Sequence, residues 1–81
     1  MARYIFPDKV ASPLAKQFGD RLRERRLALA MSQCELGERS GVAVSLIIHI
    51  ERGEANPTLS MMGNLSAAVD CYIMELFSAE T

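Results

Sequence analysis

Residues 32–51 read SQCELGERSGVAVSLIIHIE, and this stretch predicts two short helices joined by a tight turn. Ser32 and Glu35 have the spacing of a capping box, in which each side chain satisfies a free amide at the start of a helix. Gly41 ends that helix, since glycine readily adopts the left-handed backbone that a sharp turn needs. Beyond the turn, isoleucines recur at helical spacing, which predicts a second helix.

Two helices held at a steep angle across a three- or four-residue turn that contains glycine make a helix-turn-helix unit. The second helix of such a unit enters the major groove of DNA. DNA recognition is therefore the leading hypothesis from this stretch alone.

The rest of the chain predicts an all-α fold, a compact bundle of five helices with the helix-turn-helix at its centre. Ser12 and Pro13 signal the start of a first helix, and Thr58 that of the fourth. The expected helices cover about residues 13–30, 33–39, 43–52, 58–69 and 73–77. The expected apolar stripes of the first and fourth helices are Leu14, Phe18, Leu22 and Leu29, and Leu59, Met62, Leu65 and Val69. Residues 1–11 are expected to form an arm, and residues 12–81 a single domain.

Length and composition agree with one small domain. The chain has 81 residues, of which 49% are apolar, so it can bury one core but gains from tight packing or oligomerisation. Its two cysteines, Cys34 and Cys71, fit no metal-ligand spacing, and we expect reduced thiols, no metal and no cofactor. No membrane span or signal peptide is recognisable, so a cytoplasmic location is expected.

Charge is distributed unevenly along the chain. Residues 1–52 hold nine basic and six acidic residues, a net charge of +3, whereas residues 53–81 hold four acidic residues and no base, a net charge of −4. A basic face opposite an acidic one orients a protein on a polyanion such as DNA. An ordinary solvated helix surface explains the same charges equally well.

Several motifs in order resemble one family. The segment 18–77 contains FGDRLRERR, MSQCELGERSGV, IERGEANPTL and a closing MELF. With these motifs the chain resembles the Cro and lambda-repressor-like helix-turn-helix family of bacterial and phage regulators. In its length and lack of a second domain it is also similar to the controller proteins of restriction-modification systems, a branch of that family.

The resemblance implies contacts to the DNA backbone and one ion pair. Gln33, Arg52 and Asn56 match family positions that contact phosphate, although Gln33 is also an ordinary residue for a helix start. Arg26 and Glu51 match positions that pair with each other and join the first helix to the third. The alternative is that the two are solvated separately.

The second helix of the unit departs from the family pattern at its groove-facing positions. These positions hold Val44, Ser45, Ile48 and His49, where relatives usually have polar or charged residues. Ser45 and His49 can bond base edges, and Val44 and Ile48 can contact thymine methyl groups. An apolar surface on a small protein also marks protein-binding sites, so a protein partner is the alternative.

Two further features favour a second subunit. Ala30 occupies the position after the first helix where the family often has Gly or Asn, so a left-handed residue there would cost alanine about 1 kcal/mol. Gly63 inside a helix costs about the same relative to alanine. The apolar, acidic C-terminal part is the expected dimer surface. Its candidate residues are Met61, Tyr72, Ile73 and Phe77.

Two function classes follow. The first is a sequence-specific transcriptional regulator, such as a repressor, that binds double-stranded DNA as a homodimer on a palindromic operator. The second is a protein-interaction module with the same fold, such as an antitoxin or an adaptor. An enzyme is not expected, because one histidine, two isolated cysteines and unclustered carboxylates offer no nucleophile–base pair.

Overall fold

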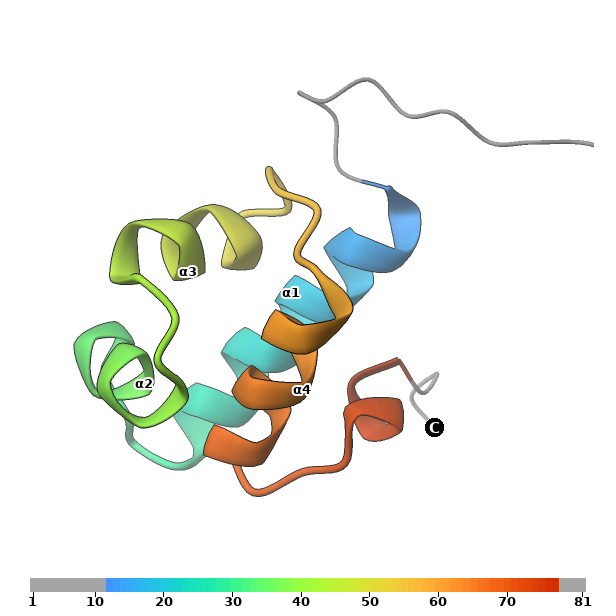
Figure 1. Ribbon diagram of the computed structural model, residues 1–81. Coiled ribbons are helices and arrows are strands. Elements are labelled where there is room, and N and C mark those ends of the chain that lie inside the picture. Colours follow the sequence, from blue (N-terminus) through green and yellow to red (C-terminus); the bar gives the residue numbers. More distant parts are fainter. Residues whose placement is uncertain (1–11, 78–81) are drawn as a thin grey trace, which may run out of the picture.

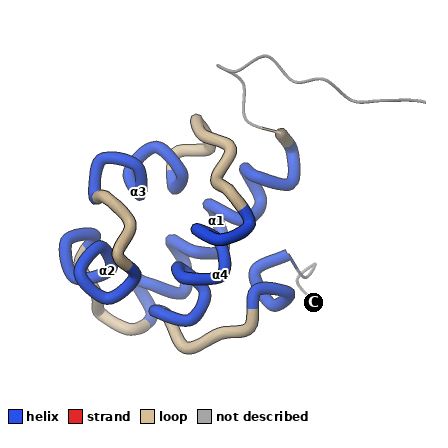
Figure 2. The backbone as a smooth tube through the Cα atoms, viewed as in Figure 1, coloured by secondary structure: helices blue, strands red, loops and turns tan. Residues whose placement is uncertain are grey.

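The computed structural model describes residues 12–77, which fold into four α-helices and one 3-10 helix joined by loops (Figure 1). They are α1 (Pro13–Ala28), α2 (Gln33–Ser40), α3 (Val44–Glu51), α4 (Leu59–Ala68) and η1 (Ile73–Phe77). The described chain contains only helices and loops, without a strand (Figure 2). The all-α prediction is confirmed, but the expected fifth α-helix is wrong, because that segment forms only a short 3-10 helix. The expected arm, residues 1–11, lies outside the described residues.

Hydroxyl side chains start three of the helices. The amides of Ala15, Glu35 and Met61 donate to the side chains of Ser12 (3.1 Å), Ser32 (2.9 Å) and Thr58 (3.1 Å). These bonds satisfy amides that the helix itself leaves free, and all three predicted caps are confirmed. Only the Ser32 half of the predicted capping box is seen, because the Glu35 carboxylate accepts from Arg39 at 3.0 Å.

Two helices end at a left-handed residue that is not glycine. Ala30 follows α1 with φ 55°, and Asp70 follows α4 with φ 58°. After Ala30, the amide of Met31 donates to the Arg26 carbonyl at 3.0 Å, which closes a Schellman motif. The left-handed backbone expected at Ala30 is therefore confirmed, and Asp70 adds a second strained position.

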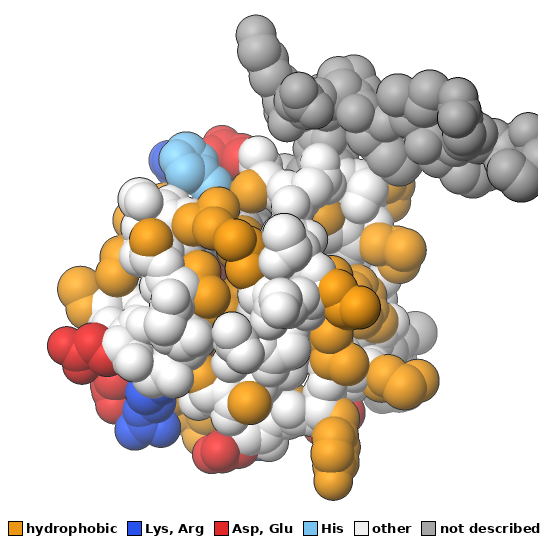
Figure 3. Space-filling model, in the orientation of Figure 1, with side chains coloured by type: hydrophobic (Ala, Val, Ile, Leu, Met, Phe, Trp, Pro, Cys, Tyr) orange, Lys and Arg blue, Asp and Glu red, His pale blue; other side chains and the backbone are white. Residues whose placement is uncertain are grey.

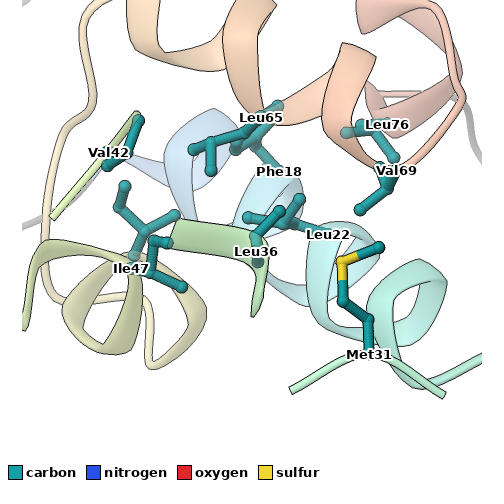
Figure 4. Close-up of a cluster of buried hydrophobic side chains, with 10 residues drawn as sticks. Phe18, Leu22, Met31, Leu36, Val42, Ile47, Leu65, Val69 and Leu76 are labelled. Carbon is teal, nitrogen blue, oxygen red and sulfur yellow. The ribbon is translucent and has the colours of Figure 1, made fainter. Parts of the chain in front are cut away.

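One hydrophobic cluster fills the interior and takes side chains from every helix (Figure 4). Its buried members are Phe18, Leu22, Met31, Leu36, Val42, Ile47, Ile50, Leu65, Val69 and Leu76. Met31 and Val42 come from the turns on either side of α2, so these turns are fixed by burial as well as by hydrogen bonds. Each of the larger side chains contributes roughly 1.5–3 kcal/mol by leaving water.

Three residues of the expected apolar stripes are exposed instead. Leu14 is 63%, Leu29 37% and Leu59 72% exposed. The buried face of α1 runs through Ala15, Phe18, Gly19, Leu22 and Arg26. Because this face includes a glycine and an arginine, hydrophobicity alone does not identify it as the buried face. Leu14 is therefore off the face, and Leu29 lies past the last helical residue.

Gly19 allows α1 to pack directly on the end of α3. A Cβ atom at this position would lie 2.0 Å from the backbone oxygen of Ile50. No side chain larger than hydrogen fits there unless one of the two backbones moves. The position of α3 on the domain therefore depends on this glycine.

Two absences hold for the described part of the chain. Within residues 12–77, no helix combines the length and the hydrophobicity needed to cross a membrane. The same residues contain no group of three or more His, Cys, Asp or Glu side chains arranged to hold a metal ion.

Candidate nucleic-acid interface

The turn between α2 and α3 is held by hydrogen bonds and by burial. Gly41 takes a left-handed conformation, φ 76°, and its amide donates to the Gly37 carbonyl at 2.9 Å. The amide of Val42 donates to the Ser40 hydroxyl at 3.1 Å, and the Val42 side chain is buried. The two helices of the unit are thus held in one fixed relation, as DNA recognition requires.

The four residues predicted to read bases lie together on one side of α3. Val44 and Ile48, and likewise Ser45 and His49, are one turn apart, so all four share the same side of the helix. Ser45 and His49 are exposed, while Val44 and Ile48 are partly exposed. The opposite side, with Ile47, Ile50 and Glu51, is buried in the domain.

Val44 also contributes to the packing of α3 on α2. One of its methyl groups lies 2.9 Å from the place where a Cβ on Gly37 would be. Part of this side chain is therefore used inside the helix-turn-helix. Ile48 is the more available of the two apolar residues for contact with thymine methyl groups.

Arg26 and Glu51 form the expected ion pair between α1 and α3. Arg26 Nε and Nη2 donate to the two carboxylate oxygens of Glu51, each at 2.8 Å. The side chains are only 9% and 2% exposed. The hydrogen bond to Glu51 raises the pKa of Arg26 above its ordinary value, against the opposing effect of burial. A third bond, from Arg26 Nη1 to the Met31 carbonyl at 2.8 Å, also holds the turn after α1.

Gln33 is connected to this pair. Its side-chain Nε2 donates to Glu51 Oε1 at 3.0 Å, so the carboxylate accepts from both α1 and α2. Every buried side-chain nitrogen and oxygen in the described residues has a partner. The residue expected to contact phosphate is therefore held at the first turn of α2 by the same network that holds α3.

Asn56 and Arg52 differ in their surroundings. Asn56 Oδ1 accepts from the Ser12 amide at 2.7 Å, which ties the loop after α3 to the start of α1. This structural role was not predicted from the sequence. Arg52 follows the last residue of α3 and is exposed, where its guanidinium can reach a phosphate.

A contact between His49 and Glu54 was not anticipated from the sequence. His49 Nδ1 lies 3.0 Å from Glu54 Oε1, and both side chains are about half exposed. Figure 3 shows the histidine on the surface beside an acidic side chain. Gly53 was the feature of the sequence that could have predicted this contact. In a Schellman motif the residue after the glycine lies next to the residue five positions before it.

The residues expected at a dimer surface are used mostly within the chain. Met61, Ile73 and Phe77 are partly buried against the core. Phe77 packs on Phe18 with ring centroids 5.5 Å apart, and its carbonyl accepts from the Gln17 side chain at 3.0 Å. Tyr72, in contrast, is 81% exposed.

Other large apolar side chains of the domain are also exposed. Leu14, Leu59 and Met74 are each more than half exposed. Hydrophobic side chains gather in Figure 3 on the side of α4 and η1. Leu59, Tyr72 and Met74 belong to residues 53–81, a segment that holds no basic residue.

Both cysteines are free thiols. Burial raises the pKa of Cys71 above its ordinary value; Arg25 lowers it, and Glu75 and Asp70 add to the rise. Cys34 is exposed on α2. Neither thiol belongs to a cluster of metal-binding side chains among the described residues.

Comparisons with known proteins agree on one family. A family model described as helix-turn-helix matches residues 22–76. A curated relative from Archaeoglobus fulgidus, an uncharacterized HTH-type transcriptional regulator, is 33% identical over 57 residues, which cover 70% of this chain and 81% of the relative.

Two solved structures are similar in both sequence and fold. The restriction-modification controller protein C.AhdI from Aeromonas hydrophila is 40% identical, with a TM-score of 0.74, over 78% of this chain and 96% of that one. SinR, the master regulator for biofilm formation, solved in complex with DNA, is 32% identical, with a TM-score of 0.71, over 75% of this chain and 98% of that one.

Proposed function

Since this chain belongs to the helix-turn-helix family of transcriptional regulators, we propose that it recognises specific sequences in double-stranded DNA as a homodimer and regulates transcription. The observation that carries the proposal is the exposed side of α3, which presents Val44, Ser45, Ile48 and His49 together. The opposite side of the helix is fixed to α1 by the Arg26–Glu51 pair. A rigid helix with one free side is what insertion into a major groove requires.

Each contact residue has a proposed role. Ser45 and His49 bond base edges, and Ile48, with the free part of Val44, contacts thymine methyl groups. Gln33 and Arg52 bond phosphates and fix the position of α3 in the groove. Asn56 orders the loop after α3 and adds a phosphate contact at its edge. SinR was solved in complex with DNA, which supports this assignment for a chain 32% identical to it.

The proposed dimer uses the C-terminal side of the domain. Tyr72 is the most exposed of the four residues predicted for the dimer surface, and Met74, two residues further along the chain, is also largely exposed. Met61, Ile73 and Phe77 are partly buried against the core, so part of each side chain remains available to a partner. Two-fold symmetry would place the two copies of α3 about 34 Å apart, one turn of DNA, and would match a palindromic operator.

Sedimentation of the full chain tests the dimer. We expect a dimer at ~10 μM and a monomer for the Tyr72→Ser, Met74→Ser double variant, with the helical circular dichroism spectrum retained. Ser45→Ala changes the proposed DNA-binding side of α3 instead, and this control variant should remain dimeric. A wild-type monomer at ~100 μM would contradict the proposed assembly, and so would a dimer that buries Ser45 and His49.

Salt dependence tests DNA binding itself. Phosphate contacts release counterions, so the logarithm of the affinity should fall steeply and linearly with the logarithm of salt concentration. Arg52→Ala should reduce the slope of log affinity against log salt concentration by about one for each bound subunit. Arg52→Lys keeps the charge and should preserve this slope. An affinity that does not change with salt would contradict the proposal.

The partly exposed apolar residues Val44 and Ile48 favour one alternative, a protein-interaction module that has kept the fold. An apolar protein interface responds little to salt. The same titration therefore separates the two functions.

A further inference from the structure

We propose that Glu54 is a positioning residue that sets which bases His49 recognises. This inference rests on the proposed function, because it assumes that α3 reads DNA. It adds a specificity determinant from the loop after α3, outside the recognition helix itself. Glu54 does this by fixing the proton of the His49 ring on one of its two nitrogens.

The backbone places the two residues together. Gly53 has φ 74°, and its amide donates to the Ile50 carbonyl at 3.1 Å. The next amide, of Glu54, donates to the carbonyl of His49 itself at 2.9 Å. These two bonds form a Schellman motif at the end of α3. The motif holds the Cα atoms of His49 and Glu54 on the same side of the helix end.

The side chains then meet. Glu54 Oε1 lies 3.0 Å from His49 Nδ1. An ionised carboxylate can only accept a hydrogen bond, so Nδ1 must carry the proton. In the neutral ring Nε2 is then an acceptor, since the bond made by one ring nitrogen decides the state of the other.

The position of this proton has a direct consequence in the major groove. An accepting Nε2 pairs with the exocyclic amino group of adenine or cytosine, the donors that these bases present there. A ring with its proton on Nε2 would instead donate to guanine O6 or N7, to thymine O4 or to adenine N7. Glu54 therefore favours adenine or cytosine over guanine and thymine at the position that His49 faces, and cytosine is the base that only this form of the ring can bind.

The charge of Glu54 argues for a role in specificity over affinity. A carboxylate next to the DNA-facing side of α3 repels phosphates, and so weakens binding to every sequence. In the free protein both side chains are about half exposed, so water competes for their bond. Docking on DNA removes that water and strengthens the bond in the bound state, where it influences base choice.

Two substitutions separate charge from hydrogen bonding. Glu54→Ala removes both the charge and the acceptor, whereas Glu54→Gln removes the charge and keeps an acceptor oxygen. Both variants should bind random duplexes more tightly than the wild type does, because the repulsion between Glu54 and the phosphates is removed. Only Glu54→Ala should change base preference, by about tenfold in favour of guanine or thymine over cytosine, at one position of each half-site.

Nitrogen-15 NMR of the imidazole provides a readout that does not involve DNA. The chain has a single histidine, so its two ring signals are unambiguous. At pH 8 we expect the wild type and Glu54→Gln to be mainly in the Nδ1–H form, and Glu54→Ala to shift towards the Nε2–H form. Retention of the Nδ1–H form in Glu54→Ala would overturn the inference.

Base preferences are measured with duplexes that carry each base in turn at every position of a half-site selected by the wild type. A preference that is the same in the wild type and Glu54→Ala would overturn the role of Glu54 while leaving the proposed function intact. A wild type with no preference for any duplex would instead remove the proposed function, and this inference with it.

Discussion

Glu51 on α3 accepts two hydrogen bonds of 2.8 Å from Arg26 on α1, and a third of 3.0 Å from Gln33 on α2. One buried carboxylate thereby joins the three helices that form and support the helix-turn-helix. Arg26 remains charged across the accessible pH range, because its pKa is raised by the bond to Glu51. The network fixes the recognition helix without using any residue of its exposed side.

Breaking this pair from one side should strongly destabilise the domain. Glu51→Ala leaves the Arg26 guanidinium buried without its partner, and we expect a loss of about 3–5 kcal/mol in the free energy of unfolding. The Arg26→Met, Glu51→Leu double variant buries no charge and should lose much less. Urea unfolding followed by circular dichroism measures both. Equal losses for the single and double variants would show that the unpaired charge is not the cause.

Gly19 and Gly63 should respond in opposite ways to the same substitution. Gly19→Ala places a Cβ against the Ile50 carbonyl and should cost about 3 kcal/mol or more. Gly63→Ala meets no atom within 4 Å and should stabilise α4 by about 1 kcal/mol. Thermal unfolding of the two variants provides the comparison. A stable Gly19→Ala protein would contradict the close contact between α1 and α3.

Ala30→Gly should stabilise the protein, although glycine usually has the reverse effect in helical proteins. The left-handed conformation of Ala30, φ 55°, is unfavourable for a residue with a Cβ. We expect a gain of about 0.5–1 kcal/mol, after allowance for the greater freedom of glycine in the unfolded chain. Ala67→Gly, at an exposed position within α4, is the matched control and should lose about 1 kcal/mol. Destabilisation by both substitutions would contradict the strain assigned to Ala30.

The sequence was most informative where a local rule operates. The hydroxyl caps follow from short-range chemistry and are confirmed, whereas the left-handed backbone found at Ala30 was expected from the family resemblance. The Arg26–Glu51 contact, which the structure contains, was expected from family resemblance and not from any local pattern. A local sequence pattern does not show which helices contact each other in the fold.

Tertiary packing decided the features that the sequence did not indicate. Gly19 is on the buried side of α1 because α3 crosses there, whereas Leu14 and Leu59 are exposed although they fit apolar stripes. Glu54 lies between the predicted helices, and its contact with His49 depends on how α3 ends. A residue that is buried where two backbones approach closely, such as Gly19, need not be hydrophobic.

The two thiols should differ in reactivity. Because burial raises the pKa of Cys71, its thiol keeps its proton to a higher pH than an ordinary cysteine, and only the thiolate attacks a disulfide reagent. At pH 8 we expect Cys34 to react first with an aromatic disulfide, and Cys71 to react at a comparable rate only in urea. Mass spectrometry of the labelled peptides assigns the order. Faster labelling of Cys71 in the folded protein would contradict its burial.

Two substitutions should separate base contacts from phosphate contacts. His49→Ala should weaken the preferred site by about 1–3 kcal/mol and leave non-specific binding almost unchanged. Gln33→Ala should weaken all sequences about equally, since a phosphate contact carries no base information. Gln33 also bonds Glu51, so unfolding of this variant must be measured alongside. Parallel losses on specific and random DNA for His49→Ala would show that His49 does not read bases.

The most direct test of readout by α3 is the affinity of the wild-type protein for a duplex selected from a random pool, compared with a scrambled duplex, at ~100 mM salt. We predict that the selected duplex is palindromic and binds about a thousandfold or more tightly than the scrambled one. Equal affinity for the two duplexes would contradict sequence-specific DNA recognition and would favour the alternative, a protein-binding role for the apolar side of α3.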